Sequence, residues 1–284
     1  MRFGTREIAA AVAIPLVLAA LFLTPPVIFN LLAAAIALGA LWEFYRMAEK
    51  AGHPVAKTLG VVYGGLVLGN AAIFWSPIRF LTPTGWVVDV AAKERPGGWF
   101  GLLLLGVGLA AVAPLLSRVP PSRALEGAAT TAWGVLSIAL PATTLCYLRA
   151  QSARGVLFLF FVVWACDSGA YYFGRRYGAH RLAPVVSPKK TWEGSGAGLA
   201  CATLFGAVAG TWWFLPELGP FRGALAGALA STAGQLGDLV ESLWKRRAGV
   251  KDSGMFLPGH GGFYDRIDSL LFAGPVVAAF VAWS

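Results

Sequence analysis

Nine apolar runs of about 17–25 residues constrain the fold of this chain more than any other feature. A run of that length, wound as an α-helix, crosses a bilayer core of ~30 Å. The composition agrees, because 57% of the 284 residues are hydrophobic and only 13% are charged. We therefore predict an all-α, polytopic integral membrane protein with about nine transmembrane helices. The runs cover residues 8–24, 27–47, 59–76, 99–117, 127–148, 155–174, 195–215, 222–243 and 263–283.

The number of helices depends on two segments that the sequence leaves open. The first run follows Arg2 and Arg6 and resembles the apolar part of a signal peptide. A small-residue cleavage site does not stand out before Pro25, and further apolar runs follow, which favours an uncleaved first helix. The connection 76–98 is itself partly apolar, so totals of eight or ten helices remain as alternatives.

The distribution of Lys and Arg predicts how the helices are oriented, because cytoplasmic loops carry an excess of these residues. With a cytoplasmic N-terminus, 17 of the 23 Lys and Arg residues lie on the cytoplasmic side. We therefore expect the N-terminus in the cytoplasm and the C-terminus on the other side. A net charge of +9 could by itself also indicate nucleic acid. Since the charges gather beside the membrane, we expect anionic substrates and no nucleic-acid partner.

We divide the chain into two parts of one integrated membrane unit. Residues 1–150 contain about five spans, and residues 151–284 contain about four spans with cytoplasmic loops 175–194 and 245–262. The chemistry is expected in the second part, because acidic residues inside membrane helices are costly and need a reason. In the first part an interfacial charge is an adequate explanation for each acidic residue: Glu7, Glu43, Glu49, Asp89, Glu94 and Glu126.

Carboxylates of the second part are predicted to gather toward the cytoplasmic face. Asp238 and Glu241 are three residues apart, as are Asp265 and Asp268, so each pair shares one face of a helix. Converging carboxylates repel one another unless a cation lies between them, and oxygen ligands favour Mg²⁺. The alternative is a set of structural ion pairs between these carboxylates and nearby arginines such as Arg266.

The two cytoplasmic loops supply groups that suit phosphates. Lys189 and Lys190 stand beside Thr191 at a predicted helix start, an arrangement that favours polyphosphate binding. In the second loop, glycines surround His260 and leave backbone N–H groups exposed to an anion. Ordinary positive-inside charge is the alternative for the basic residues. Carboxylates and cations together indicate phosphoryl or nucleotidyl transfer by direct displacement.

One segment resembles a known family. Residues 242–268 read SLWKRRAGVKDSGMFLPGHGGFYDRID, which resembles the signature of the CDP-diacylglycerol synthases, or phosphatidate cytidylyltransferases. The upstream segments CDSGAYYFGRRYG and SPKKTWEG are also similar to that family, whereas the first half resembles it only in hydropathy. Trp244 departs from the pattern, where a smaller aliphatic residue is expected. The resemblance implies transfer of CMP from CTP to phosphatidic acid, which gives CDP-diacylglycerol and pyrophosphate.

The resemblance also implies roles for individual residues. The expected catalytic residues are Asp238, Asp265, Lys251 and His260. Asp238 and Asp265 are the first choice as metal ligands, followed by Asp268 and Glu241. Asp167 is expected to support the site from the sixth span. Substrate binding falls to Lys189, Lys190, Thr191, Ser242, Lys245, Arg246, Gly261, Gly262 and Arg266.

The same resemblance implies Mg²⁺ as cofactor, with room for a second, monovalent cation such as K⁺. It further implies a homodimer. We expect the protein in the cell membrane, the cytoplasmic membrane of a bacterium, and the Lys and Arg distribution predicts an active site that faces the cytoplasm. Two other functions remain as alternatives. A transporter or channel for an anionic solute would use the carboxylates as coupling-ion sites, and a CTP-dependent lipid kinase would share the requirement for CTP. Pyrophosphate release distinguishes the three.

Overall fold

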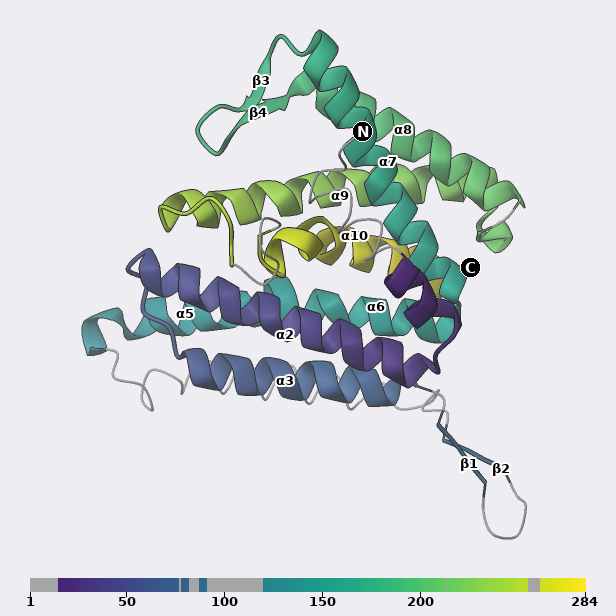
Figure 1. Ribbon diagram of the computed structural model, residues 1–284, viewed down its shortest axis with the longest axis horizontal. Coiled ribbons are helices and arrows are strands. Elements are labelled where there is room, and N and C mark those ends of the chain that lie inside the picture. Colours follow the sequence, from purple (N-terminus) through teal and green to yellow (C-terminus); the bar gives the residue numbers. More distant parts are fainter. Residues whose placement is uncertain (1–14, 77, 82–86, 91–119, 213, 255–260) are drawn as a thin grey trace, which may run out of the picture. The chain divides into compact units, whose positions relative to one another are not determined.

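The computed structural model describes residues 15–76, 78–81, 87–90, 120–212, 214–254 and 261–284. These residues are mostly α-helical, as predicted (Figure 1). The predicted run 99–117, residues 8–14 of the run 8–24, and His260 lie outside the described residues. The chain divides into two compact units. The first unit comprises Met1–Ala150 and Asp252–Asp265, and the second comprises Gln151–Lys251 and Arg266–Ser284.

Long helices form the first unit. Helix α2 spans Pro26–Lys50 and helix α3 spans Lys57–Phe74. Proline suits the first position of α2, because its fixed φ is already helical and its missing N–H is not needed there. After α3, strands β1 (Ile78–Leu81) and β2 (Val87–Val90) form an antiparallel hairpin. This hairpin occupies the connection whose structure the sequence left ambiguous.

A longer helical segment completes the described part of the first unit. It consists of a 3₁₀ turn at Pro121–Arg123, α5 at Ala124–Gly134, a π-helical turn at Val135–Ala139, and α6 at Leu140–Gln151. Pro141 lacks an N–H and its ring would clash with a carbonyl of the preceding turn. The wider π turn directly before α6 accommodates this proline within a continuous helix.

Tyr45 ties the helices of the first unit together. Its side chain is fully buried and its hydroxyl donates a 2.8 Å hydrogen bond to the carbonyl of Thr131. Gly60 of α3 and Gly134 of α5 leave the space that the tyrosine ring fills, because a Cβ at either glycine would overlap the ring. The aromatic side chain of α2 therefore requires glycines on two neighbouring helices.

The second unit contains four helices and a hairpin. Helix α7 spans Ala153–Tyr177, and Ser152 caps its N-terminus by accepting a hydrogen bond from the backbone N–H of Arg154. The hairpin and the remaining elements follow in chain order: β3 at Arg181–Ala183, β4 at Ser187–Thr191, α8 at Trp192–Trp212, a 3₁₀ turn at Pro216–Leu218, α9 at Gly219–Arg247, and α10 at Tyr264–Ala282. Helix α10 begins with two residues of the first unit.

Helices α8 and α9 pack with their backbones in close approach. Gly206 and Gly210 of α8 face Gly223 and Gly227 of α9, and a Cβ at any of the four would overlap a main-chain atom of the other helix. Small residues spaced four apart are typical of such contacts in membranes, where apolar side chains gain little by leaving the lipid. This contact fixes the part of α9 that leads to Asp238 and Glu241.

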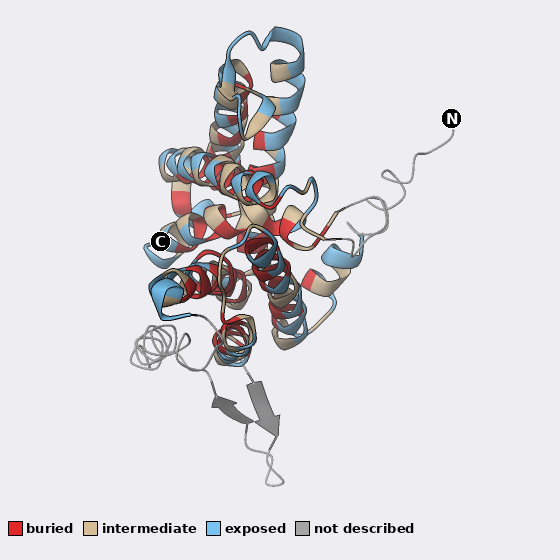
Figure 2. Ribbon diagram, turned by 90° about the vertical axis from the view of Figure 1, so that its left-hand side faces the viewer, coloured by how far each residue is buried: buried red, intermediate tan, exposed pale blue. Residues whose placement is uncertain are grey.

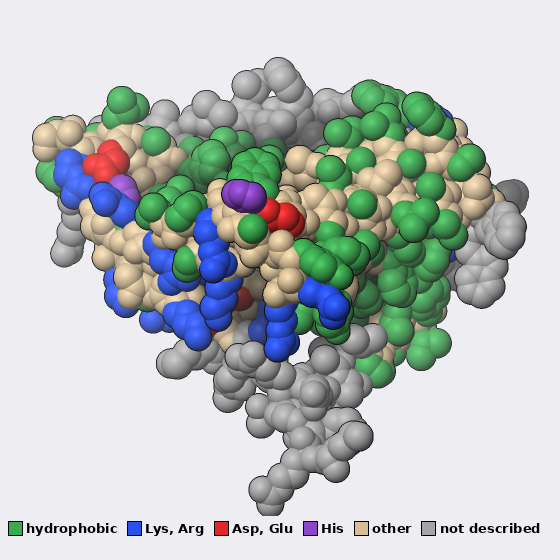
Figure 3. All heavy atoms as spheres, turned by 90° about the horizontal axis from the view of Figure 1, so that it is seen from above, with side chains coloured by type: hydrophobic (Ala, Val, Ile, Leu, Met, Phe, Trp, Pro, Cys, Tyr) green, Lys and Arg blue, Asp and Glu red, His purple; other side chains and the backbone are tan. Residues whose placement is uncertain are grey.

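Within the described residues, five helical segments are long and apolar enough to cross a membrane: Pro26–Lys50, Lys57–Phe74, Pro121–Gln151, Ala153–Tyr177 and Trp192–Thr211. Along single helices, buried positions alternate with exposed ones (Figure 2). Many exposed positions hold large hydrophobic side chains, which are visible across the surface in Figure 3. The chain is therefore a multi-pass membrane protein. Helices α9 and α10 lie outside this group of five, and a total of nine spans remains a prediction.

Candidate active site

Three carboxylates of the second unit form a compact cluster, here called the acidic trio: Asp238, Glu241 and Asp268. Each offers one oxygen, and these oxygens lie within 4.8 Å of one another. Asp238 and Glu241 are on α9, and Asp268 is on α10. Gly237 permits the approach of the two helices, because a Cβ there would lie 2.6 Å from the carbonyl oxygen of Asp268. The trio thus joins residues that the sequence placed on two separate helix faces.

Two lysines compensate the charge of the trio. Lys190 Nζ lies 2.6 Å from Asp238 Oδ2, and Lys245 Nζ lies 2.5 Å from Glu241 Oε2. The Glu241 side chain is only 1% exposed, so a cationic partner is needed to keep its charge in such a buried place. Ser242 adds a hydrogen bond from its hydroxyl to Asp238 Oδ1 at 3.3 Å. Three predicted substrate-binding residues therefore lie at the trio.

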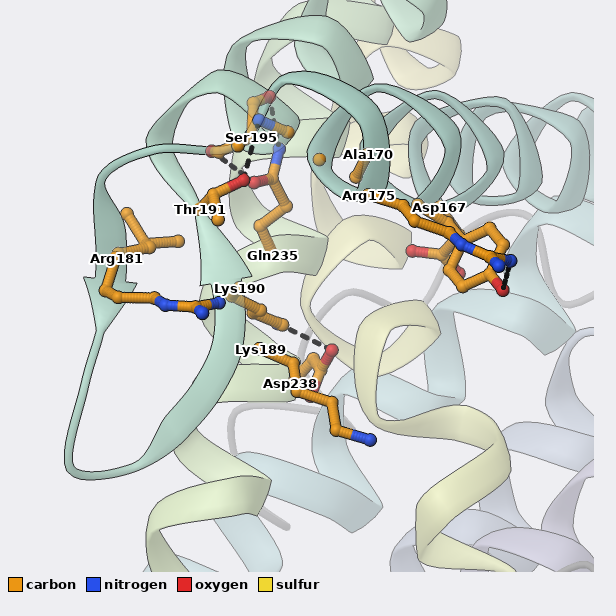
Figure 4. Close-up of a pocket in the computed structure, with 15 residues that line it drawn as sticks. Asp167, Ala170, Arg175, Arg181, Lys189, Lys190, Thr191, Ser195, Gln235 and Asp238 are labelled. Carbon is orange, nitrogen blue, oxygen red and sulfur yellow. Dashed lines mark hydrogen bonds and ion pairs between the residues drawn. The ribbon is translucent and has the colours of Figure 1, made fainter.

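A cavity of about 620 Å³ opens beside Asp238 (Figure 4). The β3–β4 hairpin brings Arg181 and Lys190 to it, and α7 brings Arg175 and Asp167. Four basic side chains and two carboxylates thus line the cavity: Arg175, Arg181, Lys189, Lys190, Asp167 and Asp238. The polar side chains of Thr191, Ser195 and Gln235 line it as well. Such a cavity can hold a polyanion such as a triphosphate.

The hairpin that carries the lysines is itself held in place. Thr191 Oγ1 accepts a 3.1 Å hydrogen bond from the backbone N–H of Gly194, which satisfies a free donor at the start of α8. Arg246 donates from Nε to the carbonyl of Val186 at 3.2 Å. The sequence predicted substrate contacts for Thr191 and Arg246. The structure shows Thr191 in the cavity wall and at a helix cap, and it shows Arg246 bonded to the hairpin.

Asp265 has different partners from Asp268, although the two are one turn apart on α10. Its Oδ2 accepts hydrogen bonds from Ser253 N at 2.8 Å, Ser253 Oγ at 2.9 Å and Gly262 N at 2.7 Å. All these groups belong to the first unit. Asp265 thus joins Ser253 to Gly262 directly before α10, whereas Asp268 belongs to the acidic trio.

Glu43 contacts the signature segment, which its position in the sequence did not predict. It was explained as an interfacial charge, but the structure buries it on α2 with 7% exposure. Its carboxylate accepts hydrogen bonds from Ser253 Oγ at 2.8 Å, Phe263 N at 3.1 Å and Tyr264 N at 2.9 Å. The sequence offered one signal, a carboxylate within an apolar stretch rich in aromatic residues, but not its partners more than 200 residues away.

The remaining predicted residues that the structure describes belong to the signature segment, residues 242–268. Gly261 has a φ of 78°, which suits glycine, and a Cβ there would lie 2.6 Å from Asp265 Oδ2. Gly262 is buried and donates to the same oxygen. Lys251 and Arg266 are exposed. The roles assigned to these residues remain predictions.

The sequence is similar to known enzymes whose substrates carry phosphate groups, as the lining of the cavity indicates. Residues 4–284 match the model of the Cytidylyltransferase family. The phosphatidate cytidylyltransferase of Haemophilus influenzae is 33% identical over 293 aligned residues, which cover 97% of each chain. The phosphatidate cytidylyltransferases of Staphylococcus epidermidis and Staphylococcus saprophyticus are 36% and 37% identical, over 70% of this chain and 80% of each relative.

In this helical membrane protein, basic side chains line a cavity beside clustered carboxylates. Such an arrangement is typical of enzymes that act on phosphorylated substrates. The chain belongs to the cytidylyltransferase family and is a nucleotidyltransferase. The family resemblance that the sequence indicated at residues 242–268 is therefore confirmed, and the match extends over nearly the whole chain.

Proposed function

We propose that this chain is a CTP:phosphatidate cytidylyltransferase, which transfers CMP from CTP to phosphatidic acid and releases pyrophosphate. One observation carries the proposal: Asp238 belongs both to the acidic trio and to the wall of the basic cavity. A nucleotidyl transfer needs both environments side by side, because a divalent metal and several cations must offset the charge of the phosphate groups. The named relatives support phosphatidate as the acceptor.

The donor set of the trio fits a hard divalent cation. Three carboxylates within 4.8 Å of one another offer oxygen atoms alone, which Mg²⁺ prefers. Asp238, Glu241 and Asp268 would hold the ion, and Lys190 and Lys245 would balance the remaining charge. Bound there, Mg²⁺ supplies charge neutralisation at the phosphates. On the motif alone, we extend the proposal to Asp265 as a ligand and to a neighbouring monovalent cation such as K⁺.

The cavity residues position the nucleotide for an in-line reaction. Lys189, Lys190, Arg175 and Arg181 attract the triphosphate. A phosphate oxygen of phosphatidate then attacks the α-phosphorus of CTP, and the bond from that phosphorus to the β-phosphate oxygen breaks. The departing pyrophosphate takes the electron pair of the broken bond. The attacking phosphate is already anionic near neutral pH, so the step requires no strong general base.

The proposal includes a location. The positive-inside distribution supports an active site that faces the cytoplasm, in the cell membrane of a bacterium. A homodimer is proposed from the family resemblance. Lys251, His260, Gly261, Gly262 and Arg266 are proposed to contact substrate phosphates on the strength of the signature.

The experiment is an assay of the purified protein in detergent with Mg²⁺, phosphatidate and CTP labelled at the α-phosphate. We expect the label in CDP-diacylglycerol together with an equal amount of pyrophosphate. In a parallel reaction with diacylglycerol in place of phosphatidate, release of labelled CDP together with a phosphorylated lipid would instead identify a lipid-alcohol kinase. Formation of neither product would contradict the proposal and favour the transporter.

A further inference from the structure

We infer that Glu43 is a positioning residue for the described ends of the signature segment (residues 242–268), because its carboxylate binds Ser253 and the backbone of Phe263 and Tyr264 at the start of α10. The inference rests on the proposed function, in which this segment handles the metal and the phosphates. Glu43 lies in the N-terminal half of the chain, far in sequence from the residues that it holds.

The contacts of Glu43 are those of a helix cap supplied by another helix. Oε1 accepts from Phe263 N at 3.1 Å, and Oε2 accepts from Tyr264 N at 2.9 Å. The first N–H groups of an α-helix have no partner within the helix. A negative charge there is also favoured by the helix dipole. The buried carboxylate of α2 therefore satisfies the start of α10 and determines where this helix begins.

Ser253 connects Glu43 to Asp265. The Ser253 hydroxyl lies 2.8 Å from Glu43 Oε2 and 2.9 Å from Asp265 Oδ2. A hydroxyl has one proton, so it donates to one of these carboxylates at a time. The carboxylates of Glu43 and Asp265 thus both contact the Ser253 hydroxyl. A substitution at Glu43 should therefore alter the position of Asp265 through Ser253 alone.

The surrounding glycines fit the carboxylate of Glu43 closely. A Cβ at Gly254 or at Gly262 would overlap the Glu43 carboxylate oxygens. One turn earlier on α2, a Cβ at Gly39 would lie 2.5 Å from the ring of Phe263. Gly254, Gly262 and Phe263 therefore fit closely against α2. A carboxylate that was only an interfacial charge would not require such a close fit.

Another carboxylate on the same helix shows what an interfacial charge looks like. The Glu49 side chain is 46% exposed and pairs with Lys57 at 3.1 Å. Glu49 and Glu43 have the same chemistry on one helix, but only Glu43 contacts the signature segment. Glu49→Gln is therefore the matched control for Glu43→Gln.

The test compares the purified wild-type chain with Glu43→Gln, Ser253→Ala, the double variant and Glu49→Gln. Hydrogen exchange is measured at the amides of residues 261–265, and pyrophosphate release is measured across a range of Mg²⁺ concentrations. In Glu43→Gln an amide NH₂ replaces one of the two acceptor oxygens, so it cannot accept the hydrogen bonds that Ser253, Phe263 and Tyr264 donate. We expect faster exchange confined to this segment. We also expect a kcat lower by about 10–100-fold, the usual effect of losing a group that orients a metal ligand, and a higher Mg²⁺ requirement.

A general loss of folded protein would lower activity without changing the Mg²⁺ concentration for half-maximal rate. Ser253→Ala should reproduce both effects, and the double variant should add little, because the residues act in one chain of contacts. Unchanged exchange in both single variants, or changed exchange with wild-type activity and Mg²⁺ dependence, would overturn the inference. If the wild type itself releases no pyrophosphate, the proposed function fails, while the exchange data still decide whether Glu43 holds the segment.

Discussion

Lys190 on β4 and Asp238 on α9 form an ion pair of 2.6 Å at the boundary between the basic cavity and the acidic trio. The pair joins the two halves of the proposed chemistry. A lysine beside a phosphate cavity can bind the nucleotide, and the same lysine holds a proposed metal ligand in place. Substitutions at the two residues should therefore have different effects.

Asp238→Asn should reduce turnover strongly without preventing folding. The amide keeps the size of the side chain but removes the charge that a metal ion needs. The loss should equal or exceed the roughly 10–100-fold effect of removing a group that orients a metal ligand. Pyrophosphate release and size-exclusion chromatography in detergent measure activity and folding. Glu217→Gln, at an exposed acidic position, is the control and should behave as wild type.

Lys190→Met should weaken CTP binding. A hydrogen bond to a charged group contributes about 1.5–3 kcal/mol, which corresponds to about 10–100-fold in the KM for CTP. The loss also leaves Asp238 without its lysine, so kcat should fall as well. Arg154→Gln, at an exposed basic position at the start of α7, serves as the control. An unchanged KM in Lys190→Met would exclude a role in holding the nucleotide.

Asp268→Asn should raise the Mg²⁺ concentration required for half-maximal activity. Asp268 contributes one of three oxygens of the trio, so its loss leaves a weaker site that more Mg²⁺ can partly fill. A chelator should abolish activity of the wild type, and added Mg²⁺ should restore it. Full activity in the presence of the chelator would contradict a metal at the trio.

Gly206→Ala should destabilise the protein, whereas Gly196→Ala on the same helix should not. A Cβ at Gly206 would overlap the backbone of α9, but a Cβ at Gly196 meets nothing within 4 Å. Overpacking of this kind costs about 1–3 kcal/mol, while alanine in an open helical position improves helix propensity by up to about 1 kcal/mol. Thermal unfolding in detergent measures the difference. Equal stability of the two variants would show that the α8–α9 contact is not tight.

Val185→Cys should report the orientation of the β3–β4 hairpin. Val185 is 87% exposed in the turn between the two strands. If the hairpin is cytoplasmic, a membrane-impermeant thiol reagent should label it in inside-out vesicles and not in intact cells. The native cysteines provide the background in the unsubstituted chain. Labelling from outside intact cells would reverse the proposed topology.

The sequence alone determined the class of protein and predicted most of the residues that gather at the candidate site. Apolar runs long enough to cross a bilayer predicted membrane helices. In lipid, a helix is one of few structures that pair all backbone N–H and C=O groups. The signature at 242–268 indicated the family, and the helical spacing of acidic residues within apolar runs brought Asp238, Glu241 and Asp268 into consideration. Local spacing suffices for such predictions, since residues three apart on a helix share a face.

Only the tertiary structure decided which carboxylates work together. The signature ranked Asp265 above Asp268 as a metal ligand, yet Asp265 accepts hydrogen bonds from Ser253 and Gly262, and Asp268 completes the trio. Glu43 looked like an ordinary charge at a helix end until its partners on the signature segment were known. These assignments depend on contacts between residues far apart in the chain, and helix periodicity carries no information about the partner that a face will meet.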